Sequence, residues 1–214
     1  MMYGIRGIRP VILSPEQLSA FAFVPITVAA GFLAYAALRR TPKYKKGEKT
    51  NVIALTVAAL VSLGMFFLFG TTVTLLKGVL LTTVFLFASF SDIQERSVPD
   101  WVSIVIALTG LISVSGSKLL WNAVAGVAAF GFFFLAAILS KNKIGGADVK
   151  FIAACMFVCG VSEGIAGLIL GLMLSVIGTL IRNKKTKSKD KTLPMIPYLS
   201  VGFLTAYMIG GLIT

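Results

Sequence analysis

The chain has 214 residues, of which 57% are hydrophobic and 13% are charged, and its mean hydropathy is +0.93. A soluble chain of this length could not bury so much apolar surface, so the composition excludes a soluble domain and indicates a polytopic membrane protein. The net charge of +12 lies in loops between apolar segments, a pattern that orients membrane proteins and does not favour nucleic-acid binding.

Eight apolar segments follow one another along the chain, and most reach the ~20 residues that span a hydrocarbon core. They cover residues 18–38, 51–69, 72–90, 101–115, 119–140, 149–160, 164–181 and 194–213. The fourth segment is somewhat short and the sixth is clearly short for a span. We therefore predict an all-α membrane bundle of about eight transmembrane helices.

The basic residues predict how this bundle is oriented. Loops after the odd-numbered segments carry most of the lysines and arginines, with dense clusters at 39–50 and 182–191, whereas loops after the even-numbered segments carry few. Because basic loops stay on the cytoplasmic side, both termini should lie outside. We therefore expect a multi-pass protein of the cell membrane, in contact with membrane lipid.

Two of the eight carboxylate side chains adjoin long apolar segments on the same predicted side of the membrane. Asp92 follows the third segment, and Asp148 opens the sixth. Ionisable residues at membrane depth are costly, so they are candidates for function. Two alternatives are that each aspartate is only a helix-end charge, or that the pair forms a proton or cation site of a small transporter or channel component.

A pair of aspartates is also the set of side chains that aspartyl proteolysis requires. One carboxylate takes a proton from water while the other, protonated, polarises the scissile carbonyl. Asp148 begins a helix and Asp92 lies near the end of one, so the helix dipoles favour Asp148 as the base and Asp92 as the acid. Gly145 and Gly146 can approach a substrate strand closely, and Pro99 suits the start of the next helix.

Several other proteolytic mechanisms require side chains that this chain lacks. The chain has no histidine, which excludes a Ser-His-Asp triad and a histidine zinc site, so we expect no metal and no cofactor. Cys155 and Cys159 lie on one helix face and are interpreted as core residues. Lys77 is expected to extend to the membrane interface, whereas Lys150 could tune the aspartate pair or extend in the same way.

Three strings in the chain resemble the motifs of the type IV prepilin peptidases and their archaeal preflagellin relatives, membrane aspartyl proteases named for a Gly-x-Gly-Asp motif. The strings run from Asp92 to Pro99, from Gly145 to Lys150, and over residues 193–198 with their two prolines. The resemblance begins near residue 72. It therefore implies a six-helix peptidase core at 71–214, preceded by a two-helix segment at 1–70 that contains the basic loop 39–50.

The resemblance also implies an activity. Asp92 and Asp148 would be the catalytic residues of an aspartic endopeptidase that faces the cytoplasm. The residues assigned to substrate binding or positioning are Gly145, Gly146, Ala147, Lys150 and Pro99. The substrate would be a prepilin-like precursor (type IV pilin, pseudopilin or archaellin) that loses a short basic leader at the cytoplasmic membrane boundary.

The chain departs from the family pattern in two ways. Ala147 replaces the second glycine of the motif, which keeps a small side chain but restricts the backbone. Family members that also N-methylate their product carry paired Cys-x-x-Cys motifs, whereas this chain has two cysteines spaced four apart. The resemblance therefore does not extend to methyltransferase activity.

Overall fold

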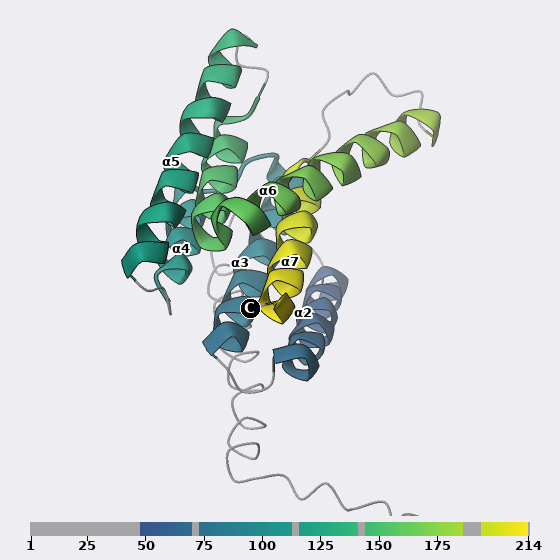
Figure 1. Cartoon of the computed structure of the whole chain (residues 1–214). Coiled ribbons are helices and arrows are strands. Elements are labelled where there is room, and N and C mark those ends of the chain that lie inside the picture. Colours follow the sequence, from purple (N-terminus) through teal and green to yellow (C-terminus); the bar gives the residue numbers. More distant parts are fainter. Residues whose placement is uncertain (1–47, 70–72, 113–115, 141–143, 186–193, 214) are drawn as a thin grey trace, which may run out of the picture.

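The computed structural model describes residues 48–69, 73–112, 116–140, 144–185 and 194–213, and it is all-helical over this part of the chain (Figure 1). The helices are α2 (Glu48–Phe69), α3 (Val73–Glu95), α4 (Asp100–Gly110), α5 (Gly116–Leu139), α6 (Gly146–Lys185) and α7 (Ile196–Ile213). The predicted segment 18–38, and most of the basic loops that follow the first and seventh segments, lie outside the described residues.

The described helices follow the predicted apolar segments. Three of them are long and apolar enough to cross a membrane: Val73–Glu95, Gly116–Leu139 and Gly146–Arg182. Shorter apolar helices cover Leu60–Phe69, Asp100–Gly110 and Ile196–Leu212. The all-helical class is confirmed for the described part of the chain, whereas the eight spans and their orientation stay predictions.

Helix α6 changes direction at Gly160, so it contains both the sixth and the seventh predicted segments (Figure 1). Gly160 has φ 79° and ψ −171°, a conformation that is nearly confined to glycine. Residues 161–163, which the sequence placed in an outer loop, are helical. The two halves of α6 therefore meet at one residue and not through a loop.

The core lies where α3, α6 and α7 come together. Gly167 and Gly171 of α6 lie against the backbones of Phe203 and Leu199 of α7, a close approach that small residues permit between membrane helices. Helix α2 packs on α3 and α7, and the fully buried side chain of Met65 joins the same core. The domain boundary at residue 70 is a prediction that these contacts do not define.

Lys77 points into the bundle, which corrects the expectation that it extends to the interface. Its Nζ donates a hydrogen bond to the carbonyl of Val158 at 3.3 Å and lies 6.0 Å from the ring centre of Tyr207. Glu163, in the second half of α6, interacts with it electrostatically. A helix break leaves carbonyl groups without their usual amide partners, so an amine here compensates for the break at Gly160.

Candidate active site

Asp92 lies in the last turn of α3 and is buried, with 8% of its surface exposed. Helix α7 begins against it, because the backbone amide of Ile196 donates a hydrogen bond to Asp92 Oδ2 at 3.0 Å. A buried carboxylate is costly unless such donors satisfy it. The start of α7 is therefore part of the environment of Asp92.

The contact comes from the proline-bearing string at 193–198, to which the sequence assigned no role. Pro197 is the second residue of α7, where a missing amide hydrogen leaves no helical bond unmade. Deeper in the bundle, the hydroxyl of Ser89 donates to that of Ser200 at 3.2 Å and ties α3 to α7. Prolines that mark a helix start are the signal that could have pointed to free amides here.

A short turn links Asp92 to α4. Arg96 adopts a left-handed conformation with φ 53°, and its amide donates to the carbonyl of Asp92 at 3.0 Å. The hydroxyl of Ser91, itself buried, donates to the carbonyl of Ser97 at 2.7 Å. Pro99, with φ −60°, is the N-cap residue directly before α4, so it sets the direction in which that helix leaves the site.

Asp148 lies in the first turn of α6 and is partly buried. A Cβ atom on Gly145 would come within 3.0 Å of Asp148 Oδ2, so glycine leaves the room that this carboxylate occupies. Gly146 is exposed, and a Cβ atom there would meet no other atom within 4 Å, while Ala147 beside it is partly buried. Of the two glycines, Gly145 is the one that lies against the carboxylate.

The structure places Asp92 and Asp148 within electrostatic range of each other. The charge of Asp92 acts on the carboxylate of Asp148, so the end of α3 and the start of α6 share one site. Deeper in the bundle, the rings of Phe85 of α3 and Phe151 of α6 lie 5.3 Å apart between centres. Among the described residues, no group of three or more Asp, Glu, Cys and His side chains is placed to hold a metal ion.

The start of α7 also changes the electrostatic comparison between the two aspartates. Helix dipoles favour Asp148 as the base when only the start of α6 and the end of α3 are compared. Asp92 is in addition bonded to the first amide of α7, so both carboxylates lie at the N-terminal end of a helix. Helix dipoles therefore do not distinguish a base from an acid in this pair.

Lys150 forms an ion pair with Asp100, the first residue of α4. Nζ of Lys150 lies 2.7 Å from Oδ1 of Asp100, and the two side chains are 45% and 73% exposed. The sequence analysis offered two other roles for Lys150. The ion pair instead links the helix of one motif to the helix that follows the other.

Comparison with known proteins adds an independent line of evidence. Residues 79–181, which include both aspartates, match the sequence model of the type IV leader peptidase family. The chain is 28% identical over 149 residues to the prepilin leader peptidase/N-methyltransferase of Bacillus subtilis (strain 168), an alignment that covers 66% of this chain and 59% of that protein. No solved structure matches the chain. The family match and the two motif aspartates within it make the chain similar to the type IV leader peptidase family.

Proposed function

We propose that this chain is a membrane aspartyl endopeptidase that removes the short basic leader of a prepilin-like precursor at the cytoplasmic membrane boundary. The observation that carries the proposal is the placement of Asp92 in the last turn of α3 and of Asp148 in the first turn of α6, where the charge of Asp92 acts on Asp148. Similarity to the type IV leader peptidase family supports the reaction class. The name of the Bacillus subtilis relative, a prepilin leader peptidase, supports a prepilin-like substrate.

The two aspartates would act as one unit. One carboxylate takes a proton from the attacking water, and the other, as the acid, hydrogen-bonds the scissile carbonyl. Two carboxylates that meet at a substrate would share a proton, because ionising both at low dielectric is costly. The amide of Ile196 holds Asp92 in place, and Gly145 leaves space beside Asp148.

The orientation belongs to the same proposal. The positive-inside rule puts the loop that follows α3, and with it Asp92, on the cytoplasmic side. A basic leader would lie there, while the apolar helix of the precursor stays in the membrane. Residues 71–214 would form the peptidase core. Methylation of the product is outside the proposal, since the alignment covers 59% of the relative that carries that activity in its name.

The transporter alternative finds no support in the family match. Transporter sites usually lie near the midplane, in broken helices of related halves. The two aspartates instead lie in terminal turns of α3 and α6. A break does occur in α6, at Gly160, but Asp148 is in the first turn of that helix, far along the chain from the break.

The test is leader removal from a defined precursor in membranes. The test precursor carries a short basic leader, one apolar helix and a C-terminal epitope tag, and is co-expressed with the full chain. We expect a faster-migrating product that persists with a metal chelator, and no product with Asp148→Asn. Glu95→Gln, a carboxyl-to-amide change at the end of α3, is the matched control and should retain cleavage. An uncut precursor beside a normally inserted unmodified chain would contradict the proposal.

A further inference from the structure

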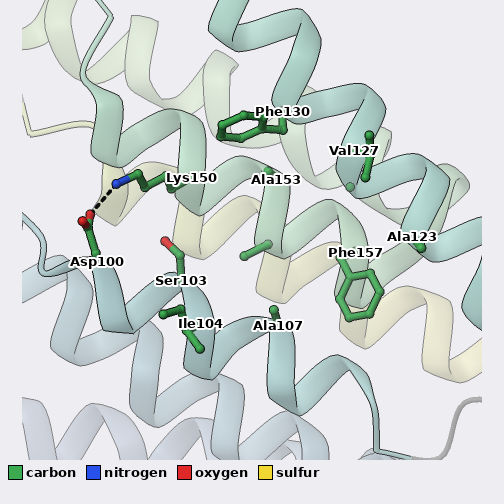
Figure 2. A pocket seen from close by; sticks show the side chains of 12 residues that line it. Asp100, Ser103, Ile104, Ala107, Ala123, Val127, Phe130, Lys150, Ala153 and Phe157 are labelled. Atoms are coloured by element: carbon green, nitrogen blue, oxygen red, sulfur yellow. Dashed lines mark hydrogen bonds and ion pairs between the residues drawn. The ribbon is translucent and has the colours of Figure 1, made fainter.

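A groove of about 700 Å³ runs along the first half of α6, between α4 and α5 (Figure 2). Helices α4 and α5 each pack on α6, but within the described residues they do not pack on each other. Helix α6 is therefore the floor of the groove, and α4 and α5 are its walls. We call this space the α4–α5 groove.

The α4–α5 groove has the length of about two helical turns. Its lining runs over 100–107 of α4, 150–157 of α6 and 123–130 of α5. At a rise of ~1.5 Å per residue, seven steps of a helix measure roughly 10 Å. In Figure 2 the labelled side chains follow one another along this direction, from Asp100 and Lys150 at one end to Phe157 and Ala123 at the other.

The lining is shaped for a helix. Small residues recur along the floor and walls, among them Ala107, Ala123 and Ala153. The hydrophobic effect does not drive helices together inside a membrane. Small side chains instead let helix backbones approach closely, and the van der Waals packing between them stabilises the contact. Ile104 and Val127 stand at the walls with 60% and 73% of their surfaces exposed, so they are free to contact an apolar partner.

One end of the groove is polar. The Asp100–Lys150 ion pair and the side chain of Ser103 lie there, whereas the lining beyond them is apolar (Figure 2). Asp100 is 73% exposed, so its carboxylate is open to further partners. The first amides of a helix carry a partial positive charge and seek an anion. A helix that enters with its N-terminus at Asp100 therefore places its first amides beside that exposed carboxylate.

The polar end adjoins the aspartates across the start of α6. Lys150 follows Asp148 by two residues, about 200° around the helix, so the two side chains leave nearly opposite faces. Gly146 lies four residues before Lys150 on the same face, and Gly145 lies against Asp148. Both glycines are exposed and present no side chain, so a chain that passes over them reaches one face from the other. An extended chain covers ~3.3 Å per residue, so about three residues cross a helix that is ~10 Å wide.

We propose that the α4–α5 groove binds the first two turns of the apolar helix of the precursor. The N-terminus of that helix lies at the Asp100–Lys150 pair, and a short extended segment crosses Gly145 and Gly146 to bring the scissile bond to Asp92 and Asp148. The inference rests on the proposed function and adds a docking site for the uncleaved helix. A lipid acyl chain fits the apolar lining but has no N-terminal amides to match Asp100.

Photo-cross-linking tests this placement. p-Benzoylphenylalanine is introduced at Val127 inside the groove, or at Phe132 on the opposite face of α5 as the matched control, since 73% and 68% of these side chains are exposed. The full chain carries Asp148→Asn so that the test precursor stays uncut. We expect an adduct with the first two turns of the precursor helix from position 127 and none from 132. Equal adducts from both positions, or only lipid or intrachain adducts from 127, overturn the groove proposal.

Kinetics give a second readout in the active chain. Val127→Trp adds bulk inside the groove without crowding the core, and should raise KM for the test precursor at least tenfold, which equals about 1.4 kcal/mol. Phe132→Trp should leave KM unchanged. Cleavage by the unmodified chain with no effect of Val127→Trp and no adduct at 127 refutes the groove alone. Absence of cleavage by the unmodified chain refutes the proposed function, and an adduct confined to position 127 would then still support the groove.

Discussion

Replacing Ile196 by proline would remove the backbone amide that donates to Asp92 Oδ2 at 3.0 Å. Ile196 is the first residue of α7, a position where proline keeps the helix intact and breaks no helical hydrogen bond. The side chain of Ile196 is also buried, with 1% of its surface exposed. Ile196→Ala therefore serves as the matched control, because it truncates the side chain and keeps the amide.

The two variants separate the cost of truncating the Ile196 side chain from the cost of losing its amide hydrogen bond. Truncating a buried isoleucine to alanine costs about 2–5 kcal/mol of folding stability. A hydrogen bond to a charged group contributes about 1.5–3 kcal/mol, which corresponds to roughly 10-fold to 150-fold in a rate that depends on it. We therefore expect Ile196→Pro to lower kcat for leader removal by one to two orders of magnitude relative to Ile196→Ala.

The assay is leader removal from the test precursor at equal amounts of inserted enzyme. Stability is followed separately by the temperature at which Cys155, fully buried in α6, reacts with a thiol reagent. The expected pattern is similar stability of the two variants and a large difference in kcat. If Ile196→Pro and Ile196→Ala cleave at rates within twofold of each other, the start of α7 does not act on Asp92.

Three further predictions concern the bundle. Gly160→Ala forces a side chain into φ 79° and should lower the free energy of unfolding by about 1–3 kcal/mol, measured by thermal unfolding in detergent; an unchanged midpoint would contradict the break. Lys77→Met and Glu163→Gln should each destabilise the protein, and the double variant should cost less than their sum because the two groups interact; strict additivity would mean that they are independent. Cysteines introduced by Lys45→Cys and Lys187→Cys should react with an impermeant reagent only from the cytoplasmic side, whereas labelling from outside would refute the predicted orientation.

The helices could be predicted because the apolar segments are long and the charged residues lie between them. The break in α6 could not be predicted. Gly160 lies among apolar residues, and its positive φ does not change the spacing or composition of the residues around it. The spacing of charges suggested an outer loop at 161–163, and the structure makes the turn at one glycine. The direction of Lys77 was missed because its partner, the carbonyl of Val158, is a backbone group that every residue carries.

The same limit applies to the candidate site. Asp92 and Asp148 stood out because acids are rare in this chain and few adjoin apolar segments. The amide that binds Asp92 has no side-chain identity, so only the prolines near Ile196 hinted at it. The Asp100–Lys150 pair joins residues far apart in sequence, and no periodic pattern connects them. Hydrogen bonds from backbone amides and ion pairs between residues far apart in sequence both depend on how the helices pack.

The central claim is that Asp92 and Asp148 form one catalytic unit, and a double-variant rate comparison tests it most directly. Leader removal is measured for Asp92→Asn, Asp148→Asn and the double variant, with insertion checked for each. Because effects inside a catalytic unit are not additive, each single variant should lose nearly the whole rate and the double variant little more. Cleavage by Asp148→Asn at close to the unmodified rate would contradict the claim.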